Sequence, residues 1–564
     1  MSLDQSQSAS GGAEMLGAEQ SGAPTIPRRS LWGLISISLF WLALNFHWTA
    51  ILFIILPSQI EALLAHSYLQ SHTLFNAGDL NGFINNNKAV ALALVSSPGL
   101  LVALVSNPLF GMLSDRTTGR FGRRKPYILC GTLLNIVGLF LMAVAPNIIV
   151  LMLALCLVQL ANNGAAAPFH AYLPDLVNAE QRGLASGMMG VAQSLGIVLG
   201  ALGVGQLIQI DPVLKATSLG AANHALSTYS NQLLIAYGVI ALFICILMLI
   251  TLVAIKEPSW QRPTRAAGEA VSGWLASYRR QMGEGALALA LVIVVLVGAL
   301  LALQAAGLSF DLNGAHLPQG SSAQAISDAA QHANIAINGV LLVIMLIVTV
   351  WALRLFDFRP RRDPDFAWVA GTRLLMMLGI NTVQGFLQYY FHDILGVQNQ
   401  EALASYFAGV LTIAAALTAF LGGWLSTRYG RKRMVYRSGG TMTVVAAIFI
   451  TLNFLVATGA LSQSGGILLA FIGGGIFGLG YGAYQSVDWA LVADVLPSKE
   501  RYARDMGIWN IAVTIPQVMA FVIGSILLSI PVPPSVRYTL LFATFLAYCL
   551  AGTVTVRYIR GVKR

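Results

Sequence analysis

The chain reads Gly111-Met112-Leu113-Ser114-Asp115-Arg116 and then Arg120-Phe121-Gly122-Arg123-Arg124-Lys125 between two long apolar runs. A matching stretch between two later apolar runs reads Gly423-Trp424-Leu425-Ser426-Thr427-Arg428-Tyr429-Gly430-Arg431-Lys432-Arg433. A second pair of residues also recurs, because Asp175 and Arg182 are matched at the same spacing by Asp494 and Arg501. Two motifs repeated at nearly one offset indicate an internal duplication.

The composition points to a lipid environment around this duplicated chain. Of 564 residues, 56% are apolar and 10% are charged, whereas about a quarter of the residues of a soluble chain are charged. A membrane-spanning helix needs about 20 apolar residues, and runs of that length recur along the chain. The sequence therefore predicts an all-α integral membrane protein.

The apolar runs divide into two sets of six with a pair between them. The repeat spans are expected near 31–58, 89–113, 127–146, 148–170, 184–209, 231–255, 366–392, 403–427, 438–458, 465–489, 504–530 and 537–557. Two further runs, 285–307 and 337–356, bring the total to about fourteen spans. The expected organisation is a disordered cytoplasmic tail (1–30), an N-terminal six-helix half (31–256), a cytoplasmic linker (257–284), an inserted two-helix hairpin (285–356) and a C-terminal six-helix half (357–564).

The net charge of +10 follows the membrane topology. Lys and Arg gather in alternate loops, and the exceptions are Lys88, Lys215 and Arg537 in the opposite loops and Arg373 inside a span. By the positive-inside rule both termini are predicted to be cytoplasmic, in an inner or plasma membrane. The basic residues are thus explained by topology, and no nucleic-acid partner is expected. We separately expect the protein to be a monomer.

No catalytic constellation is found in the sequence. The four cysteines lie singly within apolar spans and are expected to be free, buried thiols: Cys130, Cys156, Cys245 and Cys549. There is no phosphate-binding loop, no zinc-protease His pair and no nucleophile elbow. We therefore expect no enzyme activity, no cofactor and no metal.

The stretch from Gly111 to Lys125, between the second and third expected spans, resembles the signature motif of the major facilitator superfamily. Its longer form, from Ser114 to Tyr127, is similar to the sucrose-transporter-like branch, which is related to the glycoside/cation symporters. A second match to that branch is Ala161-Asn162-Asn163 with Pro168, Ala171, Leu173 and Asp175-Leu176. The resemblance implies a major facilitator fold of two six-helix halves and secondary active transport by alternating access. One departure is Gln159, where plant sucrose symporters have an acidic residue thought to carry the proton.

The motif residues are interpreted as a cytoplasmic gate. A glycine lets two helices approach closely, and an aspartate can pair with a cation and cap the neighbouring helix, so that an ionic latch holds one of two states. The gating residues expected from both halves are Gly111, Asp115, Arg116, Gly122, Arg123, Arg124, Asp175, Arg182, Gly423, Arg428, Gly430, Arg431, Asp494 and Arg501.

Polar residues inside the spans form stripes at helical spacing, which usually face a cavity or another helix. The candidates for a substrate cavity are Asn45, His47, Trp48, Asn162, Asn163, His170, Asn381, Gln384, Gln388, Tyr481, Tyr484, Gln485, Trp509, Asn510 and Gln517. Neutral amides beside aromatic rings suit the hydroxyls and ring faces of a sugar. Asp488 is the candidate proton carrier, although it can also be a partner to a neighbouring helix.

Three function classes remain open from the sequence. The leading hypothesis is transport of a sugar or glycoside coupled to a cation, with H+ as the expected ion and the lipid bilayer as the surroundings. The second is a proton-driven exporter of amphipathic compounds, which an apolar, aromatic pocket would favour. The third is a membrane sensor that binds its ligand without moving it.

Overall fold

The computed structural model describes most of the chain apart from both ends and the central region. The described residues are 28–71, 75–117, 121–170, 172, 176–178, 181–255, 257, 283, 287, 338–340, 342–347, 349–350, 353, 358, 360–495 and 502–560. The predicted tail (1–30) and linker (257–284) therefore lie almost wholly outside the described residues.

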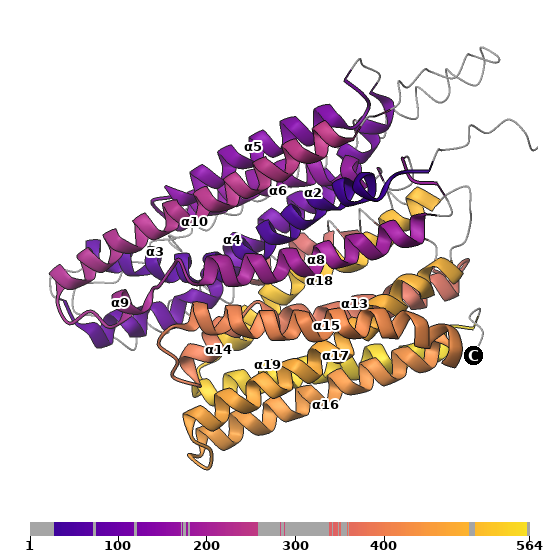
Figure 1. Ribbon diagram of the computed structural model, residues 1–564. Helices are drawn as coiled ribbons and strands as arrows, with labels where there is room; N and C mark the ends of the chain where they lie inside the picture. The colour runs from indigo at the N-terminus through magenta and orange to yellow at the C-terminus, as the bar shows by residue number, and fades with distance from the viewer. Residues whose placement is uncertain are drawn as a thin grey trace, which may run out of the picture.

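Helices make up the first half of the molecule (Figure 1). Its elements are α2 (Leu31–Thr49), η1 (Ala50–Ile55), α3 (Leu56–Ser71), α4 (Ala77–Arg116), α5 (Lys125–Ala143), α6 (Ile148–His170), α8 (Arg182–Gly205), α9 (Asp211–Leu214) and α10 (Leu219–Ala254). The first three are one continuous helix. It begins at Ser30, whose hydroxyl accepts a hydrogen bond from the Gly33 amide, an N-cap that satisfies a free donor of the first turn.

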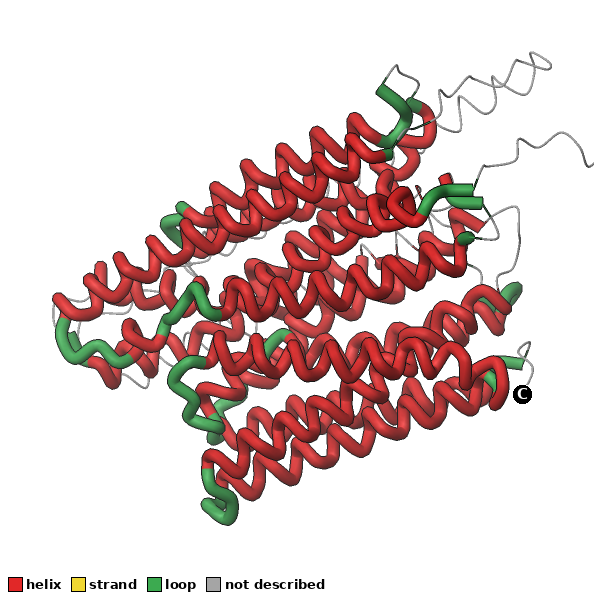
Figure 2. The backbone as a smooth tube through the Cα atoms, in the orientation of Figure 1, coloured by secondary structure: helices red, strands yellow, loops and turns green. Residues whose placement is uncertain are grey.

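The second half is likewise built of helices joined by loops (Figure 2). Its elements are α13 (Pro364–Gln384), α14 (Leu387–Asp393), α15 (Gln400–Tyr429), α16 (Arg431–Ala457), α17 (Gln463–Val495), α18 (Tyr502–Leu528), α19 (Pro534–Thr555) and the short η3 (Val556–Tyr558). Pro364 and Pro534 occupy first helical positions, where a missing N–H costs nothing.

Helix packing shows the duplication directly. In the first half α2 packs on α8 and α10, α4 and α5 pack on α6, and α10 packs on α5. In the second half α13 packs on α18 and α19, α15 and α16 pack on α17, and α19 packs on α16. The halves meet where α8 packs on α15 and α4 on α18, which is again a pair of equivalent contacts.

Twelve helices of the described residues are long and apolar enough to cross a membrane. They correspond one to one with the twelve predicted repeat spans. Their outer faces carry large apolar side chains, with 80% of Val253 and 64% each of Leu417 and Phe454 exposed, as expected of a surface in contact with lipid.

The prediction of fourteen spans has no support beyond these twelve. Residues 285–307 lie outside the described residues apart from Leu287, and the run 337–356 is described only in part, as a short apolar helix over Asn338–Ile347. The Asn338 amide is buried and donates to the Ser525 hydroxyl of α18 at 3.1 Å. Asn338, at the start of this short helix, therefore contacts the C-terminal half.

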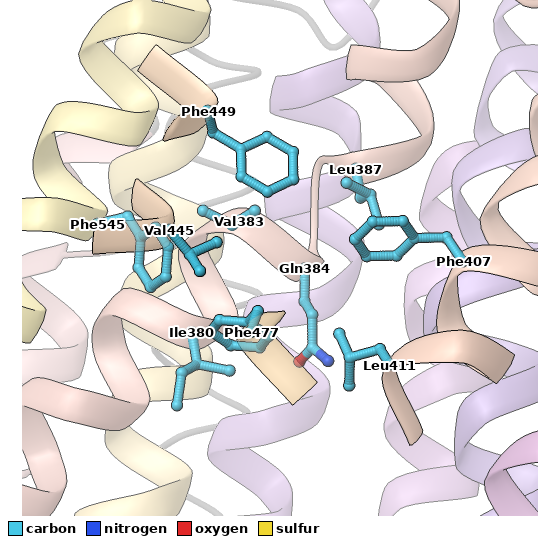
Figure 3. Close-up of a pocket in the computed structure, with 10 residues that line it drawn as sticks. All are labelled: Ile380, Val383, Gln384, Leu387, Phe407, Leu411, Val445, Phe449, Phe477 and Phe545. Atoms are coloured by element: carbon cyan, nitrogen blue, oxygen red, sulfur yellow. The ribbon is translucent and has the colours of Figure 1, made fainter. Parts of the chain in front are cut away.

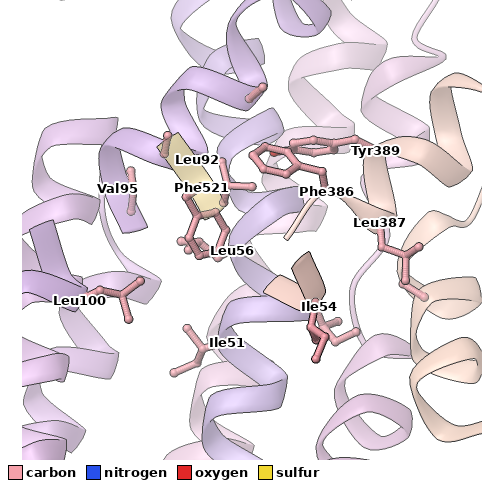
Figure 4. Packing of buried hydrophobic residues seen from close by; sticks show 14 of the residues in the cluster. Ile51, Ile54, Leu56, Leu92, Val95, Leu100, Phe386, Leu387, Tyr389 and Phe521 are labelled. Atoms are coloured by element: carbon pink, nitrogen blue, oxygen red, sulfur yellow. The ribbon is translucent and has the colours of Figure 1, made fainter. Parts of the chain in front are cut away.

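The first helix of each half is interrupted along its length. In the N-terminal half the interruption is the π-helix η1, and in the C-terminal half the chain breaks between α13 and α14, at Gly385 and Phe386. A side chain at Gly385 would meet the Phe521 ring at 2.8 Å, so the close approach of α18 requires glycine here. Figure 4 shows Phe386 and Tyr389 among the apolar side chains around Ile54 and Leu56.

Two details of the sequence interpretation were wrong. Lys88, assigned to a loop just before the expected span 89–113, lies within α4 and is buried. The cysteines are free as expected, but only Cys549 is buried, and Cys130 is exposed, because single residues on these helices can face lipid as readily as protein.

Candidate functional site

Two ends of the helix bundle are distinguished by their residues. The motif end carries Thr117 and residues 121–125, together with Gly430 and Arg560, the last described residue. The opposite end, here named the Lys88 end, carries Lys88 and Asp393. Figure 1 shows the start of α2 and the C-terminus at the same end of the molecule.

At the motif end, a carboxylate from beyond α10 holds the motif loop. Glu257 accepts the backbone N–H groups of Arg123, Arg124 and Lys125 at 2.5, 3.1 and 2.9 Å, and the Tyr172 hydroxyl at 2.6 Å. Gly122 adopts φ +93° and has no room for a side chain, because an added Cβ would lie 2.3 Å from the Glu257 carboxylate. Sequence reasoning missed Glu257, which lies outside both repeated motifs.

The predicted gating residues are described only in part. Arg124 is buried and donates to the Ser114 hydroxyl at 2.6 Å, Gly430 adopts φ +91° at the start of α16, and Arg428 lies over the Tyr429 ring at 5.8 Å. Asp175 and Arg501 lie outside the described residues, as do the side chains of Asp115, Arg116, Arg182 and Asp494 and the surroundings of Gly423.

Arg29 ties the start of the first helix to this end. Its guanidinium donates to the Leu176 carbonyl at 2.9 Å, and its backbone N–H donates to the Gln181 side chain at 2.8 Å. Partial burial lowers the pKa of the Arg29 guanidinium, which still carries its charge at any physiological pH.

The predicted polar stripe of α6 is joined to α4. Asn163 donates to the Gln159 carbonyl at 2.8 Å and to its side-chain oxygen at 3.2 Å, and it accepts from Asn107 at 3.1 Å. Asn162 is buried. His170 is exposed, with the Trp41 ring edge-on at 4.9 Å. Asn107 was missed because it is a single amide in its span, without a partner at helical spacing.

Two of the three candidates on α2 form hydrogen bonds with helix residues, one to another helix and one within α2 itself. His47 is fully buried and pairs with the Asn135 amide of α5 at 3.2 Å. Asn45 donates to the Trp41 carbonyl of its own helix at 2.7 Å. Trp48 is partly buried, with the His47 ring edge-on at 4.8 Å.

In the C-terminal half, Arg373 and Asp488 form a buried ion pair between α13 and α17. The Tyr484 hydroxyl donates to the Asp488 carboxylate at 3.2 Å, and the Trp509 ring lies 4.2 Å from the Arg373 guanidinium. The candidate proton carrier thus has a cationic partner that sequence reasoning did not assign. The sequence did contain a signal, because the expected span 366–392 holds one cation, Arg373, and the expected span 465–489 holds one anion, Asp488.

The remaining candidates of this half lie near that pair or along α13. Gln485 donates to the Tyr481 hydroxyl, and Asn381 donates to the Met377 carbonyl at 2.7 Å. Gln517 is half-buried, and the side chain of Asn510 lies outside the described residues. Figure 3 shows Gln384 as the polar member of a pocket whose other lining residues are Ile380, Val383, Leu387, Phe407, Leu411, Val445, Phe449, Phe477 and Phe545.

A second charged cluster lies between the two halves at the Lys88 end. The Lys88 ammonium lies 2.7 Å from Asp393 of α14 and 3.3 Å from Glu61 of α3, and 4.6 Å from the centre of the Tyr389 ring. Asp393 also accepts from the Tyr538 hydroxyl at 2.8 Å. Sequence reasoning found none of this, because it placed Lys88 and Glu61 outside the expected spans.

Hydrogen bonds extend this contact between the halves. Gln400 donates to Glu61 at 2.6 Å, and Glu401 accepts from the Ile210 backbone N–H at 3.2 Å. Gln388 donates to the Phe53 carbonyl at 2.7 Å and to the Ile54 carbonyl at 3.1 Å, both within η1. A π-helix leaves carbonyls without their usual i+4 partners, and the Gln388 side-chain amide donates to two of them. The interrupted first helix of one half thereby contacts the interrupted first helix of the other.

Comparison with known proteins decides the family. The family model described as "MFS/sugar transport protein" matches residues 84–314 and 361–532, well over half of the chain. The chain belongs to the MFS/sugar transport protein family. It is therefore an integral, multi-pass membrane transporter, as the signature loop predicted, and not an enzyme.

Curated relatives match this family member over parts of its length. The chain is 27% identical over 243 residues to the general alpha-glucoside permease of Schizosaccharomyces pombe, covering 39% of each protein. It is 26% identical over 193 residues to the sucrose transport protein SUC3 of Arabidopsis thaliana, covering 30% of this chain and 31% of that protein. It is 30% identical over 188 residues to the proton-associated sugar transporter A of Rattus norvegicus, covering 30% and 22%. The matches thus span well under half of these relatives.

Solved structures share the fold of this family member. The peptide transporter POT in complex with sulfate aligns with a TM-score of 0.58 at 15% identity, covering 97% of this chain and 99% of that one. The nucleoside transporter NupG aligns with a TM-score of 0.53 at 11% identity, covering 93% and 99%. At such identities the likeness establishes the major facilitator fold and nothing about substrate.

Proposed function

We propose that this transporter moves a sugar or glycoside by alternating access of its two halves, coupled to H+. The observation that carries the proposal is the polar contact between the halves at the Lys88 end, seen together with an all-helical fold whose halves repeat each other. In alternating access, one end of such a molecule closes by contacts that must break before that end opens.

The orientation of this closed end follows from the charges. The motif end carries the basic loops and is proposed to face the cytoplasm, together with both termini, in an inner or plasma membrane. The Lys88 end then faces outward and is closed to the outside in this conformation. The predicted gating residues would act at the other end, where Glu257 positions the motif loop.

The sugar is proposed from the site and from the relatives. Amides and aromatic rings of the predicted cavity stripes, such as Asn163 and Tyr481, provide hydrogen bonds and stacking surfaces without a net charge. The named relatives are a general alpha-glucoside permease, a sucrose transport protein and a proton-associated sugar transporter. Since Arg373 is paired with Asp488, no cation in the described cavity stripes is left to recognise an anionic substrate.

Coupling to a proton needs a titratable group, and Gln159 cannot supply one. Asp488 remains a candidate carrier, in competition with the interpretation that it neutralises Arg373. The proton-associated name of one relative supports H+ as the coupling ion.

A proton-driven exporter of amphipathic compounds is the second candidate. The observation that favours it is the apolar, phenylalanine-rich pocket of Figure 3, where Gln384 contributes the polar group. Such a pocket suits an apolar ring better than a sugar.

We further propose a monomer, in which the insertion between the halves acts as a buttress against α18 through Asn338.

Uptake into proteoliposomes tests the proposal. Radiolabelled sucrose, maltose and glucose are offered under an imposed inward proton gradient, with a protonophore as control. Accumulation of one sugar that the protonophore abolishes is the expected result. If no sugar moves under any gradient, the sugar proposal is overturned and export takes first place.

A further inference from the structure

The buried charges at the Lys88 end do not balance. Three carboxylates lie there, on Glu61, Asp393 and Glu401, with Lys88 as the ammonium between the first two. Glu61 and Glu401 have no exposed surface, and Lys88 is 2% exposed. Asp393 is 16% exposed and also lies beside the His392 ring and in the field of the Arg537 guanidinium. Ionising both Glu61 and Glu401 would therefore set two negative charges with no exposed surface against the one Lys88 ammonium, which Asp393 shares, and this is strongly unfavourable.

The imbalance falls on Glu401. Asp393 has Lys88, Tyr538 and the His392 ring at 3.0 Å, and Glu61 has Lys88 and Gln400. Glu401 has one carboxylate oxygen on the Ile210 N–H, and its other oxygen, Oε2, is buried with no hydrogen-bond partner among the described residues.

The surroundings of Glu401 reinforce this. The charged groups that act on it are two further carboxylates, Glu61 of α3 and Asp211 of α9. Of the other elements packed here, α10 contributes the Tyr229 hydroxyl, which bonds to Ser58 at 2.8 Å, and α4 contributes Lys88, which is engaged by Glu61 and Asp393. A buried carboxylate facing other carboxylates is stabilised by taking up a proton.

We propose that Glu401 is the group that takes up the coupling proton from the Lys88 side. When the Lys88 end is open, water reaches the carboxylate, and a proton passes from hydronium to Oε2 with no other bond made or broken. The neutral acid can then be buried as Ile210 and Glu401 come together and the end closes. This inference rests on the proposed proton-coupled transport, and it moves proton uptake from Asp488 to a residue between the halves.

Glu401→Gln tests the site because the amide preserves the shape and the oxygen that accepts from Ile210. The matched control is Asp79→Asn, which removes an exposed carboxylate in the first turn of α4 at the same end. Asp488→Asn serves as the competing site. Infrared spectra of the full chain in lipid at neutral pH report the carbonyl band of a protonated carboxyl group.

The expected result is a protonated-carboxyl band in the wild-type chain, in Asp79→Asn and in Asp488→Asn that disappears in Glu401→Gln. Absence of the band from the wild-type chain, or its persistence in Glu401→Gln, overturns the inference. This measurement needs no substrate, so it decides the protonation of Glu401 even if the sugar proposal fails.

Transport in proteoliposomes provides the second readout. Glu401→Gln should exchange labelled for unlabelled sugar across the membrane while losing accumulation under a proton gradient, and Asp79→Asn should keep both. Accumulation by Glu401→Gln at the wild-type level overturns the inference. Failure of the wild-type chain to move any sugar instead counts against the proposed function.

Discussion

Two buried ion pairs distinguish the regions of this transporter. Arg373 and Asp488 join α13 to α17 within the C-terminal half, whereas Lys88 and Asp393 join α4 to α14 across the two halves. Both pairs carry a tyrosine hydroxyl on the carboxylate and an aromatic ring beside the cation. Their chemistry is similar, and their positions differ.

Position decides what each pair can do. If the halves move as rigid bodies, Arg373 and Asp488 keep their distance throughout the cycle and stabilise the C-terminal half. Lys88 and Asp393 must separate whenever the Lys88 end opens, so their interaction energy enters the balance between the two states directly. The pair within one half is therefore structural in this account, and the pair between the halves is part of a gate.

The largest effect is expected from Lys88→Met. The change leaves the fully buried Glu61 without its cation and removes the nearest cation from Asp393, and breaking a buried pair costs about 3–5 kcal/mol. Because the cost applies to the closed Lys88 end, we expect that end to open and sugar accumulation to be lost. Thermal unfolding and uptake measure the two effects, and normal accumulation would contradict the gate.

Arg373→Met provides the matched change within one half. It leaves Asp488 uncompensated, so a similar loss of about 3–5 kcal/mol in the stability of the C-terminal half is expected. Replacing Asp488 by Leu as well should restore most of the stability without changing which end is open. A shift toward an open Lys88 end in this double variant would show that the two pairs are not distinct in role.

Gln388→Leu tests the joint between the interrupted helices. Losing the amide leaves the Phe53 and Ile54 carbonyls short of a donor, at a cost of about 1–3 kcal/mol for buried groups. The closed state should weaken, and transport should slow less than in Lys88→Met. The control is Gln463→Leu, which removes an exposed bond to the Gly396 carbonyl within one half and should leave transport unchanged.

The smallest effects are expected from the two tyrosines. Tyr538→Phe and Tyr484→Phe each remove one hydroxyl from a carboxylate that retains its cation, at a cost of about 1 kcal/mol. Only Tyr538→Phe should change the transport rate, because only its carboxylate belongs to the contact between the halves. Equal transport rates for the two variants, compared in one vesicle preparation, would argue against a gating role for Asp393.

The sequence was sufficient for the fold because the lipid environment imposes a simple pattern. Each spanning helix must be long and apolar, so the twelve repeat spans and the duplication could be predicted from the sequence. The π-helix η1 could not, since Ala50–Ile55 has the composition of an ordinary helix. Its irregular backbone is accommodated by contacts with the other half, notably Gln388.

Of the charged residues in the candidate sites, only those inside the expected apolar spans could be recognised from the sequence. Asp488 and Arg373 stood out because they interrupt apolar runs, but nothing in either helix shows that they face each other. Lys88 follows three asparagines and Glu401 follows a polar loop, so both were indistinguishable from surface residues. Their burial depends on how the two halves meet, which is a tertiary property that no single stretch of sequence encodes.

The most direct test of the gate measures the distance between the halves at the Lys88 end. Spin labels are placed on Thr217→Cys and Ser464→Cys, two exposed positions on opposite halves, in a chain whose four native cysteines are replaced. We predict two distances, a shorter one for the closed end seen here and a longer one that sugar and pH repopulate and that dominates in Lys88→Met. A single distance, unchanged by sugar, pH or Lys88→Met, would contradict the account.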